Sequence, residues 1–190
     1  MGPAHEARDD DVGRYLVSSA PPLSLKLLNS MNQTGFTTAL GFAFELSPWV
    51  VERAWRERPF ASVEAMHEAM MDVLRAASVE DKLALIRAHP ELAGKAAVAK
   101  QLTAESTAEQ ASAGLDRLTP EEFDRFHALN TAYNARFDFP FIIAARLNDK
   151  ASILRAMEAR AANDEATEIS EAIKQIGLIS KLRLLDAVTD

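Results

Sequence analysis

The amino-acid sequence predicts an all-α fold, a single helical-bundle domain of about seven to eight helices. Helix start signals followed by apolar residues at helical spacing recur from Leu23 onward, and strand patterns are nearly absent. The only stretch that resembles a strand is FPFIIAA at residues 139–145, and a helix opened by Pro140 fits it equally well. With 190 residues, of which 48% are hydrophobic, the chain is long enough to bury one core.

The first 22 residues differ in composition from the rest of the chain. They combine glycine, proline and the acidic triplet Asp9–Asp11 with little apolar periodicity. We therefore expect residues 1–22 to be a flexible lead and residues 23–190 to form the all-α domain.

Three serines mark helix starts in the first half of the domain. Ser47 precedes Pro48, which suits the first turn of a helix because its missing N–H needs no partner there. Ser62 is expected to cap a helix over VEAMHEAMMDVLRAA, whose apolar residues recur at helical spacing. Ser78 is expected to start a further helix that ends just before the next proline.

The second half of the domain contains the strongest helix start signal. Thr119, Pro120 and Glu122 supply an N-cap, a first-turn proline and the carboxylate of a capping box. They predict a helix over EEFDRFHALNTAYNARF. Two more helices are expected at about residues 149–162 and 164–188.

Composition argues against several classes of protein. The formal net charge of −7 argues against general binding to nucleic acid or to anionic membranes. No apolar run approaches the roughly 20 residues needed to span a bilayer. The sequence has no cysteine, which removes disulfides and thiolate catalysis. Because no apolar leader opens the sequence, the expected location is cytoplasmic.

Metal, phosphate and serine-hydrolase motifs are not found. No two of the four histidines stand three or four residues apart, so no metal site is expected. The seven glycines are scattered and form no phosphate-binding loop, and G-x-S-x-G is absent.

His89 stands directly before Pro90 at the predicted end of a helix. Proline disfavours helical backbone at the preceding residue, so the side chain of His89 should be held in one direction. It could simply be a cation favoured at a helix C-terminus. It could also be a titrating group in a site, because the ordinary pKa of histidine lies near neutrality.

Two later segments also leave two interpretations open. Ser106 and Glu109 have the spacing of a capping box, but the same helix N-terminus could face an anionic or carbonyl-rich ligand. The segment at 139–145 ends at Arg146. It is either a core element beside a surface charge or a source of backbone hydrogen bonds for a planar polar ligand.

Four segments, taken in order, resemble the OHCU decarboxylase family. They are GFTTALGFAFELSPWVVERAW, AHPELAGK, LTAESTAEQASAGLDRLTPEEFDRFHALNTAYNARFDFPFIIAAR and ISKLRLLDAV, and the resemblance covers roughly residues 23–188. The family acts on 2-oxo-4-hydroxy-4-carboxy-5-ureidoimidazoline (OHCU), an intermediate of urate breakdown, and releases CO2 to give (S)-allantoin. The resemblance therefore implies an all-α, cofactor-free enzyme that is generally a homodimer.

The resemblance also implies the residues of the site. Its H-P motif gives a catalytic His89, its S-x-x-E-Q motif gives Glu109, and its last helix gives Arg183. The substrate-binding residues that it implies are Pro90, Ser106, Thr107, Ala108, Gln110, Phe141, Ile142, Ile143, Ala144, Ala145 and Arg146. Asp138 is a departure, because the family commonly has glycine at this position, so the turn before residue 139 could differ.

Two alternatives to this activity remain. The chain could be an enzyme of the same fold that acts on another ureido or imidazoline compound. It could instead be a helical protein-interaction module, which would present an exposed apolar groove and would not need His89 and Glu109 to converge. A catalytic role requires His89, Glu109 and Arg183 to meet in one pocket.

Overall fold

The structure is a computed structural model that describes residues 22–94 and 101–190. This part of the chain contains nine α-helices, close to the seven to eight expected, and the all-α prediction is confirmed. The α-helices are α1 (Leu25–Ser30), α2 (Gln33–Leu40), α3 (Pro48–Ala54), α4 (Val63–Ala76), α5 (Val79–Ala88), α7 (Ala104–Ser112), α8 (Pro120–Phe137), α9 (Lys150–Arg160) and α10 (Glu165–Ala187). The short 3-10 helices are η1 (Gly41–Ala43), η2 (Trp55–Glu57) and η3 (Ala145–Leu147).

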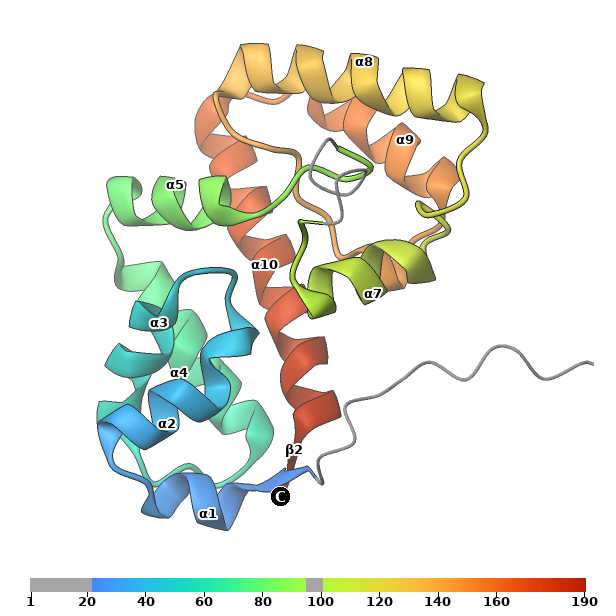
Figure 1. Ribbon diagram of the computed structural model, residues 1–190. Coiled ribbons are helices and arrows are strands. Elements are labelled where there is room, and N and C mark those ends of the chain that lie inside the picture. The colour runs from blue at the N-terminus through green and yellow to red at the C-terminus, as the bar shows by residue number, and fades with distance from the viewer. Residues whose placement is uncertain (1–21, 95–100) are drawn as a thin grey trace, which may run out of the picture.

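The long helix α10 runs through the middle of the molecule (Figure 1). Helices α1–α4 gather along its C-terminal half, whereas α8 and α9 lie at its N-terminal end. Its apolar residues, including Ile173, Ile176 and Leu184, recur at three- to four-residue spacing and are buried. Glu168 and Arg183 are buried on the same helix, so α10 carries two charges into the interior.

Gly177 allows α4 and α10 to approach closely. A Cβ atom at this position would lie 2.7 Å from Cε of Met71. The carbonyl of Gly177 lies 2.9 Å from Nε2 of His67, which is half-buried between the two helices. The glycine thus serves helix packing rather than a turn.

Local capping signals account for most helix starts. The hydroxyls of Ser62 and Ser78 accept hydrogen bonds from backbone N–H groups in the first turns of α4 and α5, as predicted. Thr119 and Glu122 form the predicted capping box at the start of α8. Ser47 stands at the N-cap of α3, but its side chain makes no capping hydrogen bond, which corrects the role expected for it.

The segment at 139–145 is neither of the two elements considered for it. Residues 140–144 have no regular secondary structure, and Ala145 begins the short helix η3. Pro140 has no N–H to donate, and side chains from α9 and α10 bind the backbone groups that follow it. These side chains replace a neighbouring strand or helical turn as partners for the carbonyl of Ile142 and the N–H of Ala144.

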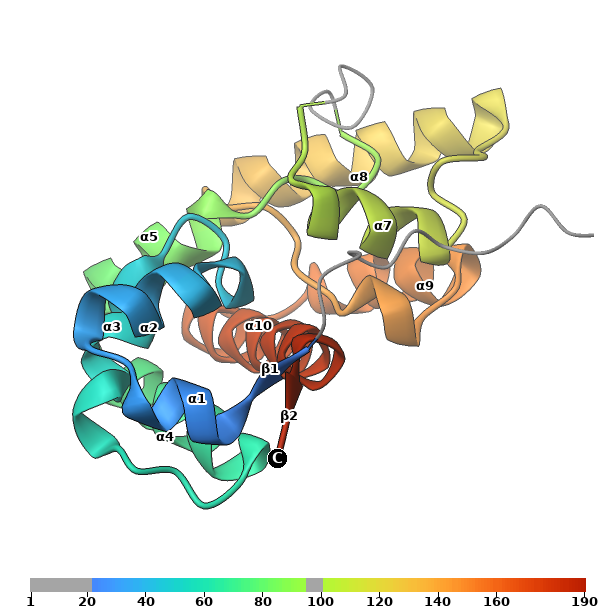
Figure 2. The same ribbon diagram turned by 60° about the horizontal axis from the view of Figure 1, so that its bottom comes forward.

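The two ends of the described domain lie side by side (Figure 2). Strand β1 (Leu23–Ser24) pairs in parallel with β2 (Val188–Thr189), directly after α10. The side chain of Asp190 accepts a hydrogen bond of 2.8 Å from the N–H of Val63 at the start of α4. These contacts tie the start of α1 and the start of α4 to the end of α10.

Two further expectations concern the flexible lead and the lack of a membrane-spanning segment. The predicted flexible lead, residues 1–22, lies outside the described residues except for Pro22. Among the helices that the structure describes, none has the length and apolar character required to cross a bilayer.

Candidate functional site

A pocket at the middle of the molecule brings the three predicted catalytic residues together. It encloses about 380 Å³ of space that is not filled by atoms, part of it open to solvent. Four segments form it: the end of α5 with the following loop, α7, the segment before η3, and α10. The lining residues are His89, Pro90, Leu92, Ser106, Glu109, Gln110, Phe141, Ile142, Ile143, Ala145, Ile179 and Arg183.

His89 is buried at the C-cap of α5, with the extended backbone that a residue before proline adopts. Its Nδ1 lies 2.9 Å from the carbonyl oxygen of Leu85. Because a carbonyl can only accept, Nδ1 carries the proton and Nε2 is left as the basic nitrogen. Burial lowers the pKa of His89, against the smaller raising effects of the Leu85 hydrogen bond and the charge of Glu45. The neutral imidazole is thus favoured, and the interpretation as a helix C-terminal cation does not fit.

The side chains of Ser106 and Glu109 do not cap a helix. Thr103 is the N-cap of α7, and its hydroxyl accepts the N–H of Ser106 at 3.2 Å. Ser106 and Glu109 lie one turn further along the helix and face the pocket. The capping-box interpretation is therefore wrong for this pair, whose side chains take part in the contacts of the pocket instead.

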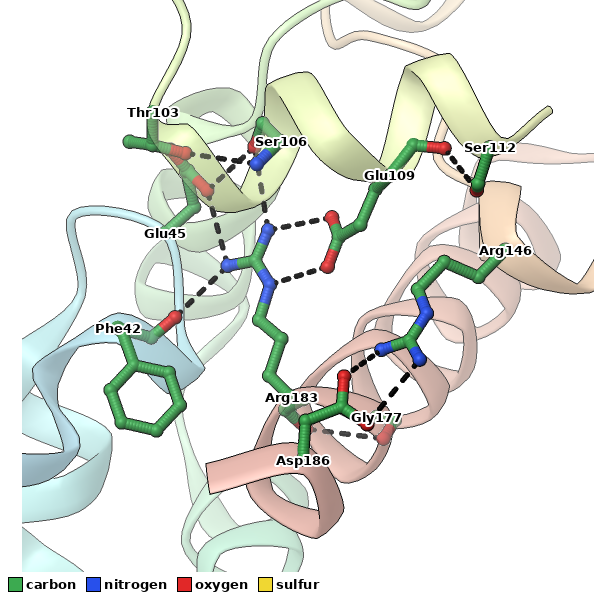
Figure 3. A network of polar contacts seen from close by, with 11 residues as sticks. Phe42, Glu45, Thr103, Ser106, Glu109, Ser112, Arg146, Gly177, Arg183 and Asp186 are labelled. Carbon is green, nitrogen blue, oxygen red and sulfur yellow. Dashed lines mark hydrogen bonds and ion pairs between the residues drawn. The ribbon is translucent and has the colours of Figure 1, made fainter. Parts of the chain in front are cut away.

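Arg183 donates all five of its N–H groups to the protein (Figure 3). Nε and Nη2 bind the two carboxylate oxygens of Glu109 at 2.7 and 2.8 Å, a bidentate pair. Nη1 donates to the carbonyl of Phe42 at 3.0 Å and to Glu45 at 3.3 Å. Nη2 also donates to the hydroxyl of Ser106 at 3.3 Å. Burial and these carboxylates act in opposite directions on the pKa of Arg183, and the net effect raises it.

Glu45 is a member of this cluster that the sequence reasoning missed. Its side chain is only 5% exposed, and Oε2 also accepts a hydrogen bond of 3.1 Å from the hydroxyl of Ser106. One signal could have found it: a charged residue stands alone within the apolar stretch GFAFELSPW, where burial is costly unless the charge is paired. Two carboxylates thus meet one guanidinium, and with neutral His89 the cluster has a formal charge of −1.

Gln110 holds the loop that follows His89. Its Oε1 accepts the N–H of Ala93 at 2.9 Å, and its Nε2 donates to the carbonyl of Glu91 at 3.3 Å. Asn130 of α8 supports the same loop by donating to the carbonyl of Leu92 at 2.8 Å. Gln110 lines the pocket as expected for a substrate contact, but both ends of its amide already bind this loop.

Four of the predicted substrate-binding residues do not line the pocket. Thr107 and Ala108 are exposed on the opposite side of α7, where the Thr107 hydroxyl donates to the carbonyl of Thr103, the N-cap residue. Ala144 is buried behind the pocket wall. Arg146 forms an ion pair of 2.5 Å with Asp186 (Figure 3).

Among residues 22–94 and 101–190, three residues other than glycine have left-handed backbone, and each borders a segment of the site. They are Leu46 with φ 45°, Ala93 with φ 51° and Asp138 with φ 56°. Leu46 follows Glu45, Ala93 lies in the loop after His89, and Asp138 precedes the 139–145 segment. Such backbone costs free energy that the surrounding contacts must offset, and it is frequent at functional sites.

Asp138 keeps the backbone that glycine adopts readily at the end of a helix. Its carbonyl accepts Nε of Arg87 at 2.9 Å, and its carboxylate accepts Nη2 at 2.6 Å. The turn after α8 therefore has the left-handed form in spite of the substitution, and the altered turn that the sequence left open is not seen.

Within residues 22–94 and 101–190, no three histidine, aspartate or glutamate side chains converge in a way that could hold a metal ion. The acidic groups of the pocket are instead directed at Arg183.

Comparison with known proteins gives consistent matches. The family model for OHCU decarboxylase matches residues 29–185. The chain is 39% identical over 162 residues to the 2-oxo-4-hydroxy-4-carboxy-5-ureidoimidazoline decarboxylase of Halalkalicoccus jeotgali, covering 85% of this chain and 90% of that protein. It is 40% identical over 164 residues to the protein of the same name from Haloferax volcanii, covering 86% and 95%.

A solved structure extends this likeness to the fold. The crystal structure of (S)-allantoin synthase superposes with a TM-score of 0.70 at 27% identity. The match covers 87% of this chain and 54% of that one, so the chain spans about half the length of this structural relative.

Replacing Arg183 by methionine should destabilise the fold strongly. The change leaves the buried carboxylates of Glu45 and Glu109 without their cation, which typically costs about 3–5 kcal/mol of unfolding free energy. The matched change Arg146→Met breaks an ion pair whose partners are 33% and 56% exposed, and it should cost less than about 1 kcal/mol. Urea unfolding at neutral pH measures the unfolding free energy of both variants. Equal losses of unfolding free energy would contradict the expected difference between the buried and the exposed ion pair.

The lowered pKa of His89 predicts a pH-dependent contribution to stability. Near pH 6.5 the unfolded chain binds a proton that the folded chain resists, so the unfolding free energy falls as the pH drops below this value. His89→Gln removes this pH-dependent contribution to the unfolding free energy. The stability advantage of the wild type over the variant should therefore be smaller at pH 5.5 than at pH 7.5 in urea unfolding. A difference that does not change with pH would show that His89 is not resisting protonation.

Proposed function

The chain belongs to the OHCU decarboxylase family, and we propose that it converts OHCU to (S)-allantoin and CO2 in urate breakdown. The observation that carries this proposal is the convergence of His89, Glu109 and Arg183 in one pocket. An interaction module would not need this convergence. An enzyme for a related ureido compound is the second candidate, which substrate comparison distinguishes.

The reaction needs little electronic help from a cofactor. The departing carboxylate sits on a ring carbon next to a carbon–nitrogen double bond, and the electron pair left by CO2 delocalises into that imine. One proton then reaches the former imine nitrogen. As the hydroxyl loses its proton to become a carbonyl, another proton must reach the carbon that bears the ureido group, and the face of its arrival sets the handedness of allantoin.

His89 is suited to manage this second proton. Its Nε2 is the basic nitrogen of a neutral imidazole, so it can receive the proton that the hydroxyl loses and deliver it to carbon. Its ring is held by the hydrogen bond to the carbonyl of Leu85, and Pro90 restricts the backbone of His89, which supports delivery to one face only. Such a group typically contributes about 10²–10⁴-fold to the rate.

Glu109 is proposed to orient the substrate hydroxyl, with Arg183 acting through it. Each carboxylate oxygen of Glu109 already accepts one N–H of Arg183, and each retains a lone pair for a further donor. Because the five N–H groups of Arg183 are occupied, this residue is better suited to hold Glu109 than to grip the departing carboxylate. Ground-state binding of that carboxylate would in any case not accelerate its loss.

The first test is circular dichroism of allantoin formed from freshly generated OHCU. The wild type should produce the (S) signal faster than the spontaneous, racemic reaction, and His89→Ala should lower this rate by about 10²–10⁴-fold. Glu109→Gln should also lower it, because an amide cannot accept at both oxygen positions. His127→Ala, on an exposed position of α8, is the matched control and should retain the wild-type rate.

Two outcomes of this experiment would contradict different parts of the proposal. If the folded wild type gives no acceleration over the spontaneous reaction, the decarboxylase function is wrong. If His89→Ala retains full activity, the function stands and the role of His89 is wrong.

We also propose a homodimer with a cytoplasmic location, since both follow from the family resemblance and the composition of the chain. Sedimentation velocity at micromolar concentration should give a particle of two chains. A single-chain particle over the whole concentration range would contradict the homodimer.

A further inference from the structure

A second buried ion pair lies behind the pocket wall, outside the site described above. Glu168, at the start of α10, is fully buried, and Arg160, at the end of α9, is 12% exposed. Oε1 of Glu168 accepts Nε of Arg160 at 2.9 Å and the hydroxyl of Tyr133, while Oε2 accepts the amide of Asn163 at 2.7 Å. Burial and the neighbouring Glu168 raise the pKa of Tyr133, so its hydroxyl keeps the proton that it donates.

Stability alone is a weak reason for such a pair. Removing two charges from water costs free energy that their attraction only partly returns, and apolar side chains of similar volume often serve as well. The remaining donor of Arg160 suggests another role. Its Nη1 donates to the carbonyl of Ile142 at 2.7 Å, and its guanidinium lies 4.3 Å from the centre of the Phe141 ring. Both Ile142 and Phe141 line the pocket.

These contacts fix the orientation of two peptide groups. A trans peptide is planar, so the N–H of Ile143 points opposite to the carbonyl of Ile142, which faces Arg160. In the next peptide, the N–H of Ala144 donates to Oε1 of Gln175 at 3.0 Å, so the carbonyl of Ile143 points opposite to Gln175. Neither Arg160 nor Gln175 lines the pocket, whereas Ile143 does. In the part of the chain that the structure describes, no protein hydrogen bond uses the N–H or C=O of Ile143.

We propose that Arg160 is a positioning residue, held in place by Glu168, that aims the backbone of Ile143 into the pocket as a donor–acceptor pair. An N–H beside a C=O matches the –NH–C(=O)– edge of a ureido group or of the imidazoline ring. The inference rests on the proposed function: the family resemblance already implies that Ile143 contacts the substrate, and the new assignment is the role of Arg160 in orienting its backbone. The segment depends on Arg160 because residues 140–144 have no helical or sheet hydrogen bonds of their own.

The double variant Arg160→Met/Glu168→Gln tests this role while removing both buried charges together. The glutamine keeps an acceptor for Tyr133, and the methionine fills volume without binding Ile142. Because a misdirected donor weakens binding of substrate and transition state alike, KM should rise about tenfold or more, with a smaller change in kcat. The matched control is Arg125→Met/Glu158→Gln, which removes an exposed ion pair between α8 and α9 and should leave both constants unchanged.

A second measurement observes the backbone amide of Ile143 directly. Enzyme labelled with ¹⁵N-isoleucine is titrated with (S)-allantoin, and the amide signal of Ile143 should shift along with that of Ile179, which lines the pocket on α10. In the double variant the shift of Ile143 should be lost.

Two results would overturn the proposal: an unchanged KM in a folded double variant, or an Ile143 signal that stays fixed while that of Ile179 moves. Inactivity of the wild type would instead contradict the proposed function, and the amide titration would then decide the inference by itself.

Discussion

The arrangement of the site depends on one buried guanidinium. A guanidinium without acceptors is costly to bury, so the chain must bring an acceptor to each N–H of Arg183. These acceptors come from the turn that contains Phe42 and Glu45 and from Ser106 and Glu109 of α7, while α10 supplies the arginine. The hydrogen bonds fix the turn and α7 relative to the central helix. Helices α7 and α10, held together in this way, form two of the pocket walls.

Around this centre, the polar groups divide into those that hold the structure and those that remain available to a ligand. Arg183, Gln110 and Arg160 each place their donors on the protein itself, although each lies at or beside the pocket. Within the described part of the chain, Nε2 of His89 and the backbone N–H and C=O of Ile143 make no hydrogen bond to the protein. The few groups that can bind a ligand are thus held in position by a larger number of buried polar contacts. The site therefore needs little rearrangement when a ligand binds.

The features predictable from sequence are those set by near neighbours. The capping box at Thr119 and the fixed direction of His89 depend on residues within four positions, and both could be predicted. The pattern at Ser106 and Glu109 was ambiguous because the same spacing serves caps and sites, and Thr103 one turn earlier decided it. Helical periodicity could have shown that the two residues after Ser106 face away from Glu109. The apolar neighbours of Glu45 could have indicated a buried, paired charge, but its partner could not be predicted, because Arg183 on α10 lies 138 positions away.

The separation between Phe42 and Arg183, 141 residues, also has a kinetic meaning. A contact across most of the chain requires closing a long loop, and its entropy cost must be met before the contact contributes anything. Helices defined by local caps can form within microseconds, whereas the guanidinium finds its acceptors only when α10 docks against the N-terminal helices. The site is complete only when these distant segments have met, so regain of activity during refolding reports on the whole topology rather than on helix content.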